Sequence, residues 1–265
     1  MSEKETKVEL DPAFDPFKSR PKKSTNIKKM VAVVSGKGGV GKSTVAALLA
    51  SHAAKDGYKV GVIDGDIVGP SMGHLFNIHH PVFGTKEGID PALSELGVKV
   101  MTSNMLVESE TTPILWRGAL ITNAVKDFYT EVLWNDLDLM VVDMPPGTGD
   151  IALTVFQSLP ISGIIIVTSP QDLVTMIVSK AVEMAHKMNV PILGIIENMA
   201  YMEHNGERLY PFGQPKSENL AASYDIPLLA QLPIDPKLVK CADAGEIESY
   251  DSEDFHWLVE TLLGE

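Results

Sequence analysis

The chain has 265 residues, of which 45% are hydrophobic, and its 22 basic and 35 acidic side chains give a formal net charge of −13 at pH 7. This length suits one large α/β domain or two small ones with a sizeable core, and the negative charge argues against general nucleic-acid binding. No apolar run approaches the roughly 20 residues of a membrane span, and the N-terminus has no apolar secretory core, so we expect a cytoplasmic protein.

The N-terminal segment is polar and is interrupted by Pro12, Pro16 and Pro21. It predicts a flexible arm over residues 1–27, followed by one folded domain over residues 28–265. Six basic residues between Lys18 and Lys29 lie in a stretch without acids. We interpret this stretch as a solvated leader, and contact with an acidic partner is the alternative.

The first predicted strand leads into a glycine-rich loop. Met30–Val34 is a short apolar run typical of a buried strand, and Gly36–Ser43 follows with the phosphate-loop pattern G-x-x-x-x-G-K-S. Apolar residues at helical spacing then predict a helix to about Lys55, which Asp56-Gly57 ends. The glycines therefore lie at the turn from a strand into a helix, which is the context that the motif needs.

This loop predicts binding of ATP and Mg²⁺. Glycine lets the backbone approach a ligand closely, so that successive N–H groups and the first turn of the helix converge on an anion. We expect Lys42 to reach the β- and γ-phosphates, the Ser43 hydroxyl to ligate Mg²⁺ and Thr44 to donate to an α-phosphate. The predicted nucleotide-binding residues of the loop are Gly36, Lys37, Gly38, Gly39, Val40, Gly41, Lys42, Ser43 and Thr44.

Two aspartates follow the next predicted strand, Tyr58–Ile63. Asp64 and Asp66 would lie at its carboxyl end, where open α/β sheets bind ligands. Carboxylates suit Mg²⁺ or can position an attacking water, so both are candidate metal ligands and Asp66 is also a candidate catalytic residue. An ordinary Asp-Gly turn is the alternative.

A strand is predicted over Val98–Thr102, and Trp116-Arg117-Gly118 leads into a helix that should extend to about Glu131. Arg117 is a candidate contact for a phosphate or a partner subunit. A surface charge at the start of a helix is the equal alternative.

A strongly apolar strand, Leu137–Val142, ends in Asp143. A hydrophobic strand with a terminal aspartate is the second signature of phosphate-loop ATPases, and the carboxylate orders the Mg²⁺ shell. In the proline-rich loop that follows, the Gly147 N–H is a candidate contact for the γ-phosphate, so this loop could act as a hydrolysis switch. A rigid Pro-Gly turn is the alternative.

Strands and helices continue to alternate to the end of the chain. We expect strands at Gly163–Thr168, Pro191–Ile196 and Leu228–Leu232, and helices at Asp172–Met188, Ser217–Ala222 and Ser252–Leu263. This alternation predicts a doubly wound α/β fold with a mostly parallel sheet and helices on both faces. Asn198, at the predicted end of a strand that a loop follows to Gly213, is either a bidentate partner of an adenine edge or a strand-end cap.

Several motifs carry a family resemblance. Lys37 gives the loop a second lysine, K-G-G-V-G-K-S-T, which resembles the deviant loop of the MinD/ParA/nitrogenase-iron-protein class, where that lysine reaches the nucleotide of a partner subunit. The segment Trp134–Asp150, with D-G-D-I-V-G-P-S, P-I-L-W-R-G and E-N-M-A-Y, is similar to the Mrp (ApbC) family of these ATPases. The resemblance covers roughly Lys28 to Leu263.

The resemblance implies an ATP-binding, slowly hydrolysing homodimer that binds iron–sulfur clusters and transfers them to apoproteins. The nucleotide roles that it implies fall on Lys37, Lys42, Ser43, Thr44, Asp66, Asp143 and Asn198, with Lys37, Lys42, Asp66 and Asp143 as the catalytic set.

One departure from the family is clear. Members usually carry C-x-x-C between E-N-M-S-Y and G-E-R, whereas this chain has Met202-Glu-His-Asn205 there and only one cysteine, Cys241. Two thiolates per dimer fall short of the usual four cluster ligands. A cluster role would then depend on a partner that supplies thiolates. The alternatives are an ATP-dependent switch that regulates or positions a protein partner, and a metabolic enzyme, which ranks last.

Overall fold

The computed structural model describes residues 18–22, 24–106, 118–147, 149–170 and 174–264, with the side chains of residues 118–122, 150, 151, 174 and 177 left aside. Its strands are β1 Asn26–Val34, β2 Val60–Asp64, β3 Ala92–Leu93, β4 Lys99–Met101, β5 Asp136–Asp143, β6 Gly163–Thr168, β7 Ile192–His204, β8 Glu207–Leu209 and β9 Leu228–Pro233. Its helices are α1 Lys42–Lys55, α2 Met72–Leu75, α3 Gly118–Thr130, α4 Asp150–Ser158, α5 Val174–Met188, α6 Ser217–Tyr224, α7 Pro236–Ala244 and α8 Glu253–Leu263, with 3₁₀ turns η1 Ser103–Leu106 and η2 Ile247–Ser249.

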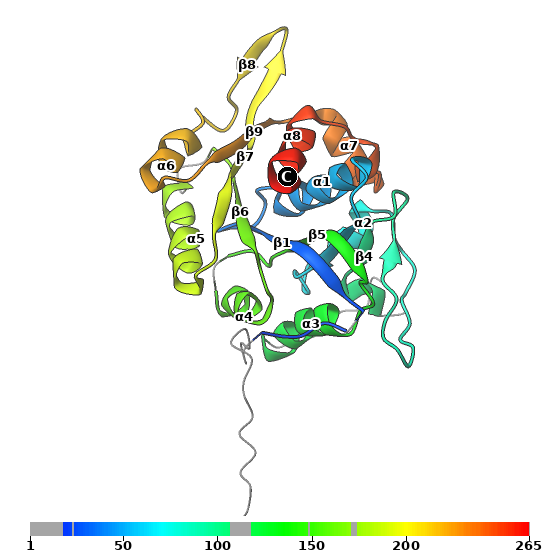
Figure 1. Ribbon diagram of the computed structural model, residues 1–265. Helices are drawn as coiled ribbons and strands as arrows, with labels where there is room; N and C mark the ends of the chain where they lie inside the picture. Colours follow the sequence, from blue (N-terminus) through cyan, green and yellow to red (C-terminus); the bar gives the residue numbers. More distant parts are fainter. Residues whose placement is uncertain (1–17, 23, 107–117, 148, 171–173, 265) are drawn as a thin grey trace, which may run out of the picture.

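One nine-stranded sheet crosses the molecule in the order β3-β4-β2-β5-β1-β6-β7-β8, with β9 also paired to β7 (Figure 1). The pairs among β4, β2, β5, β1, β6, β7 and β9 are parallel, whereas β3 and β8 are antiparallel to their neighbours. The predicted doubly wound, mostly parallel α/β fold is confirmed.

Side-chain alternation along the central strand divides the core into two halves. Met30, Ala32 and Val34 of β1 pack into the half that includes residues of α3, α4 and α5. Val31 and Val33 pack into the opposite half with residues of α1, α2 and α8. Because both faces of the sheet are covered, its central strands are continuous apolar runs rather than alternating ones.

The register of the central strands brings three sequence motifs to one edge. Val33 of β1 pairs with Asp143 at the end of β5, and Asp64 at the end of β2 pairs with the same residue. These strands are parallel, so the phosphate loop after β1 and the acidic ends of β2 and β5 meet at the carboxyl edge of the sheet.

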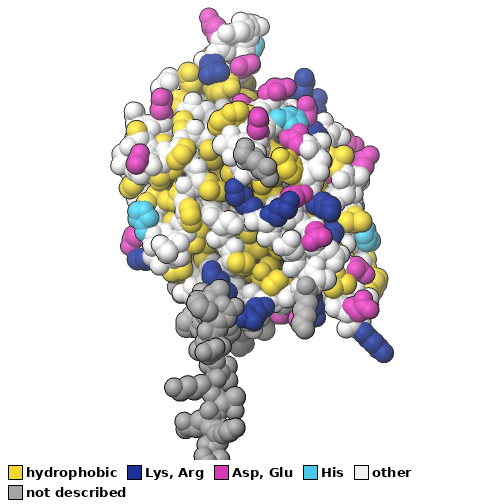
Figure 2. Space-filling model, viewed as in Figure 1, with side chains coloured by type: hydrophobic (Ala, Val, Ile, Leu, Met, Phe, Trp, Pro, Cys, Tyr) yellow, Lys and Arg dark blue, Asp and Glu magenta, His cyan; other side chains and the backbone are white. Residues whose placement is uncertain are grey.

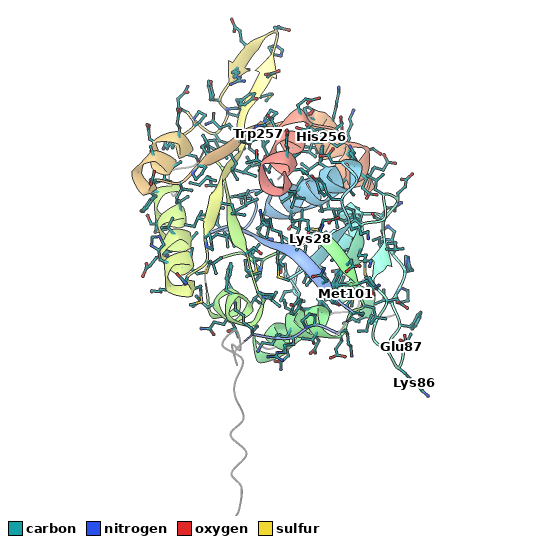
Figure 3. All side chains as sticks on the ribbon, in the orientation of Figure 1. Lys28, Lys86, Glu87, Met101, His256 and Trp257 are labelled. Carbon is teal, nitrogen blue, oxygen red and sulfur yellow. The ribbon has the colours of Figure 1, made fainter. Side chains whose placement is uncertain are left out.

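The C-terminal helix α8 packs against α1 on one face of the sheet. His52, fully buried on α1, accepts the Ser252 N–H at 3.0 Å, and burial lowers its pKa to about 4. His256 of α8 lies 2.7 Å from the Asp56 carboxylate at the end of α1, while its neighbour Trp257 is exposed (Figure 3).

The described part of the predicted arm lies against the domain. β1 begins at Asn26, four residues before the expected Met30. The Lys18 ammonium donates to the carbonyls of Phe156 and Leu159 at 3.0 and 2.6 Å. Carbonyls at the end of a helix lack intrahelical partners and attract cations, so the C-terminus of α4 holds this lysine. Residues 1–17 lie outside the described residues.

The predicted end of the strand at Asn198 is wrong. β7 continues to His204 and turns back through Asn205-Gly206 into β8, in place of the expected loop. Both turn residues have positive φ, 51° and 80°, and Asn-Gly suits the type I′ turns that join hairpin strands. The β7–β8 hairpin projects beyond the body of the molecule (Figure 1). Among the described residues, no helix has the length and apolar character needed to cross a membrane.

Candidate functional site

The phosphate loop is an open cradle at the start of α1. Gly39 and Gly41 have φ values of 81° and 82°, a region that glycine adopts without strain. A Cβ added at Gly38 or Gly39 would meet nothing within 4 Å. No side chain caps α1 at Gly41, so its first-turn N–H groups remain for an anion.

Lys42, Ser43 and Asp143 form the centre of the site. The Lys42 ammonium donates to Asp143 Oδ1, and the Ser43 hydroxyl donates to Oδ2 at 2.6 Å. Lys42 is 6% exposed and Asp143 is fully buried. Burial raises the pKa of Asp143, and Lys42 and Ser43 oppose that shift. The ion pair of Lys42 with Asp143 therefore fixes both buried side chains and joins the phosphate loop to the acidic end of β5.

Asp64 and Asp66 occupy different environments. Asp64 is fully buried and accepts the backbone N–H groups of Ser71 and Met72 at 2.9 and 3.0 Å. Burial, with the nearby Asp143, raises its pKa to about 7. Asp66 is half-buried at the rim, and one of its oxygens accepts the Gly69 N–H at 3.2 Å. Asp64 thus holds the chain entering α2, and Asp66 lies nearer solvent.

Gly65, which the sequence analysis did not single out, allows the strand ends to approach each other. Its N–H donates to the Asp143 carbonyl at 2.8 Å. A Cβ at Gly65 would lie 2.7 Å from that same oxygen, closer than side-chain carbons approach backbone. The glycine in D-G-D therefore does more than form a turn, because it lets the residue before Asp66 lie against the end of β5.

The loop after Asp143 is hydrogen-bonded to the end of β1 and to Ser35, directly before the phosphate loop. The Gly147 N–H, expected to meet a γ-phosphate, donates to the Ser35 carbonyl at 2.9 Å, and the Met144 N–H donates to Val33 at 3.1 Å. In this structure the Gly147 donor is engaged, so a phosphate contact would require that bond to break. Thr148 lies outside the described residues.

Asn198 contacts the phosphate loop itself. Its Nδ2 donates to the Val40 carbonyl at 2.9 Å, and the side chain is 6% exposed. A Cβ at Gly41 would lie 2.2 Å from Nδ2. The hydrogen bond to Val40 was not expected from the sequence. The contact of Asn198 with an adenine edge stays a prediction.

The remaining predicted residues lie around the same loop. Lys37 is half-buried, and its backbone carbonyl accepts the Ser35 hydroxyl at 3.0 Å. Thr44 is half-buried in the first turn of α1. Arg117 lies outside the described residues. The structure thus brings Lys42, Ser43, Asp64, Asp66, Asp143 and Asn198 around one loop.

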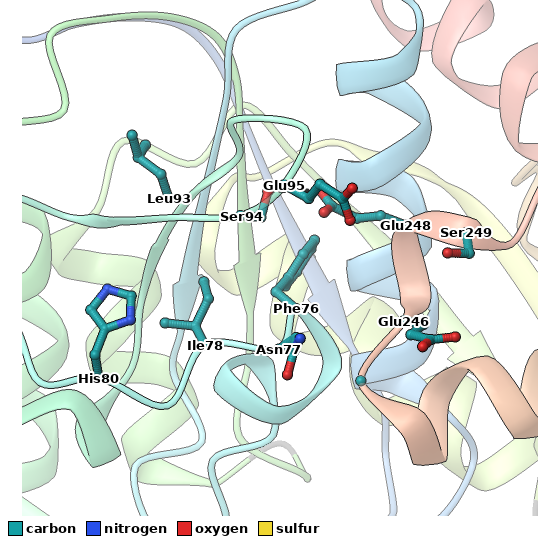
Figure 4. A pocket seen from close by; sticks show the side chains of 11 residues that line it. Phe76, Asn77, Ile78, His80, Leu93, Ser94, Glu95, Glu246, Glu248 and Ser249 are labelled. Atoms are coloured by element: carbon teal, nitrogen blue, oxygen red, sulfur yellow. Dashed lines mark hydrogen bonds between the residues drawn. The ribbon is translucent and has the colours of Figure 1, made fainter.

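A separate pocket of about 300 Å³ lies between the end of α2, the β3–β4 turn and η2 (Figure 4). Phe76, Ile78 and Leu93 form its apolar side and Glu95, Glu246 and Glu248 its acidic side. Ser94 donates its hydroxyl to Glu248 at 2.6 Å. No predicted nucleotide-binding residue lines this pocket, so we assign the nucleotide site from the phosphate-loop geometry.

A family model described as ParA: NUBPL iron-transfer P-loop NTPase matches residues 26–262. The chain belongs to this family. The resemblance drawn from the sequence motifs is confirmed. Two curated relatives support it: the iron-sulfur cluster carrier protein of Clostridium perfringens is 46% identical over 237 residues, 86% of this chain and 84% of that protein. The iron-sulfur cluster carrier protein of Pseudomonas fragi is 42% identical over 253 residues, which are 91% of this chain and 85% of that protein.

Solved structures agree with the family. The nucleotide-binding protein of Archaeoglobus fulgidus in complex with ADP, in which cobalt was found, is 44% identical, with a TM-score of 0.78 over 87% of this chain and 92% of that one. The cell division ATPase MinD of Pyrococcus furiosus is 19% identical, with a TM-score of 0.64 over 89% of this chain and 98% of that one. The second likeness establishes the fold alone.

Proposed function

We propose that this chain binds Mg–ATP, hydrolyses it slowly and uses that cycle in iron–sulfur cluster assembly. The observation that carries the proposal is the contact of Lys42 and Ser43 with the buried Asp143 at the foot of an open phosphate loop. The ADP complex of the Archaeoglobus relative, at 44% identity, supports nucleotide binding. The iron–sulfur cluster carriers among the relatives support the biological role.

The donors around the loop fit Mg²⁺. The Ser43 hydroxyl and the carboxylates of Asp66 and Asp143 are oxygen ligands, which Mg²⁺ prefers, and Ser43 already lies 2.6 Å from Asp143. When bound, the ion would neutralise charge on the phosphates. Asp64, a candidate Mg²⁺ ligand from the sequence, is left out of this set because both of its oxygens accept backbone N–H groups. We assign it to positioning this edge of the sheet.

The residues divide the chemistry among them. Lys42 and the first-turn N–H groups of α1 would stabilise negative charge on the β- and γ-phosphates. Asp66, half-buried at the rim, would orient the attacking water. Little covalent chemistry is needed from a protein in phosphoryl transfer, so positioning and electrostatics suffice.

We also infer that the active form is a homodimer in which Lys37 reaches the nucleotide of the partner subunit. Lys37 lies within the loop and is half-buried, and its likeness to the second lysine of the MinD/ParA class supports this role.

Lys37→Ala should still bind ATP, because Lys42 and the α1 N–H groups remain, but it should lose hydrolysis and nucleotide-dependent dimer closure. Phosphate release measures hydrolysis, and light scattering with and without a non-hydrolysable ATP analogue measures dimerisation. Lys86→Ala, at an exposed lysine in the turn between Thr85 and Gly88 (Figure 3), is the matched control. A Lys37→Ala protein that hydrolyses ATP like the parent would exclude the cross-subunit role.

The cluster itself would be cargo held with a partner's help. The β7–β8 hairpin stands where the family carries its paired cysteines, and it offers Glu203, His204 and Glu207 instead. Figure 2 shows acidic side chains and a histidine on this projection. Cys241 lies on α7 rather than on the hairpin. We therefore propose a cluster-assembly partner or apoprotein client that supplies thiolates, in the cytoplasm.

The missing hairpin cysteines also favour a second candidate, an ATP-dependent switch that acts on a protein partner without any cluster. Both candidates share the nucleotide site and the homodimer. They differ in whether iron and sulfide associate with the protein when its partner is present.

A further inference from the structure

One residue beside the phosphate loop has an unusual backbone conformation. Of the six non-glycine residues with positive φ in the described part of the chain, four are asparagines and one is an aspartate. Those side chains tolerate the left-handed region. The sixth is Met199, with φ 56°. A long apolar residue held there costs free energy, and such strain tends to occur at functional positions.

Met199 lies in a bulge of β7. Glu197 pairs with Gln231 of β9 and Tyr201 pairs with Pro233, so four steps along β7 correspond to two along β9. Extra residues in one strand re-aim the side chains at the bulge. Asn198 and Met199 thereby turn toward the phosphate loop.

Asn198 and Met199 lie close to the phosphate loop at Val40 and Gly41. The buried Asn198 amide donates to the Val40 carbonyl at 2.9 Å. A Cβ at Gly41 would lie 2.2 Å from that nitrogen and 3.7 Å from the Met199 Cε. The loop conformation therefore depends on where the bulge places these two side chains.

The bulge separates a fixed segment from a projecting one. Before it, the fully buried Glu197 accepts the Lys216 N–H at 3.0 Å and the Gln231 amide at 2.9 Å. After it, the Tyr201 carbonyl accepts the Ile234 N–H at 2.7 Å. Beyond Tyr201, the strand pairs in the described residues only with β8. The bulge thus sets how the hairpin leaves the sheet.

We propose that the Asn198–Met199 bulge positions the phosphate loop through the Val40 carbonyl and links nucleotide binding to the β7–β8 hairpin. Asn198 is then a positioning residue that acts on the loop. Because linkage between two binding sites is reciprocal, a partner engaged on the hairpin changes nucleotide affinity. The proposal rests on the proposed nucleotide binding and goes beyond it.

The first test separates action through the loop from contact with the base. Asn198→Asp keeps the shape of the side chain but places an oxygen against the Val40 carbonyl. Calorimetry would measure binding of Mg–ATP and of inorganic tripolyphosphate, which has no base. We expect both affinities to fall about five- to tenfold. Asn189→Asp, at an exposed position before β7 and outside the hairpin, is the matched control and should change neither.

The outcomes are distinct. A loss confined to ATP would show that Asn198 acts on adenine and would overturn the positioning role, as would unchanged binding of both ligands. If the parent protein bound neither ligand, the proposed function would fail as well, and this inference with it.

The second test addresses the hairpin. Hydrogen exchange of the amides from Met202 to Leu209 would be compared with and without a non-hydrolysable Mg–ATP analogue. We expect at least a roughly threefold change in the parent and its loss in Met199→Gly, since glycine fits φ 56° but removes the side chain that lies beside Gly41. Asn189→Gly, at another positive-φ position, should behave like the parent. An unresponsive parent hairpin, or an equal response in Met199→Gly, would refute the link.

Discussion

Replacing Lys42 by alanine should weaken Mg–ATP binding by about tenfold or more, because it removes a charge-assisted phosphate contact worth roughly 1.5–3 kcal/mol. The same change leaves the fully buried Asp143 without its cation. Burial already raises the pKa of that carboxyl, and the loss of the Lys42 ammonium should raise this pKa further. Calorimetric titration with Mg–ATP measures the loss of affinity.

A matched control is available on the same helix. Lys55→Ala removes a lysine from the last turn of α1, where it pairs with the exposed Asp251 at 2.8 Å, and it should bind ATP like the parent. Circular dichroism should verify folding. If Lys42→Ala does not fold, Lys42→Gln keeps a hydrogen-bond donor without the charge and should show the same direction of change. Unchanged ATP affinity in a folded Lys42 variant would refute the assignment of the site.

Gly65→Ala should reduce the rate of ATP hydrolysis by about a hundredfold, the loss expected when a catalytic group is displaced by about 1 Å. The new Cβ would lie 2.7 Å from the Asp143 carbonyl oxygen. Backbone cannot yield as a flexible side chain does, so the loop that carries Asp66 must move away from β5. Steady-state phosphate release measures the effect.

The same loop offers the control for this change. A Cβ at Gly69 would approach only the Asp66 carboxyl group, at 3.8 Å or more, which is ordinary van der Waals contact. Gly69→Ala should therefore hydrolyse ATP at nearly the parental rate. Equal activity of the two alanine variants would mean that the close approach of Gly65 to β5 is not needed for catalysis.

The sequence predicted those parts of the fold in which local pattern and tertiary structure agree. Gly163–Thr168 is a buried apolar run that forms β6 with the predicted bounds, and Asp56-Gly57 ends α1 after Lys55 as expected. The phosphate loop was recognisable because its glycines, its lysine and the flanking strand and helix all serve one anion site. Asp143 followed from its place at the end of a strongly apolar strand.

Other features depended on signals that were overlooked. Asp235 caps α7 by accepting the Lys237 N–H at 2.8 Å, Pro236 begins the helix and Gly245 ends it with φ 73°. Those are recognised start and stop signals, yet this helix was not predicted. The Asn205-Gly206 pair likewise indicates a hairpin, where the structure has β7 and β8 in place of the expected loop.

A third group could not be read from local sequence. Asn198 is 158 residues from Val40, and their hydrogen bond arises from the bulge in β7. Asp64 accepts N–H groups from the start of α2 because the chain turns back over the end of β2. Such contacts are set by tertiary packing, which composition and periodicity do not report.

We propose that this chain supplies nucleotide chemistry to cluster assembly without holding a cluster by itself. Iron and acid-labile sulfide per chain, measured after anaerobic reconstitution and desalting, test it most directly, with Cys241→Ser compared in parallel. We expect little or no retained iron and sulfide in either protein. A stable four-iron cluster that survives desalting in the parent would contradict it, and its loss in Cys241→Ser would identify the ligand.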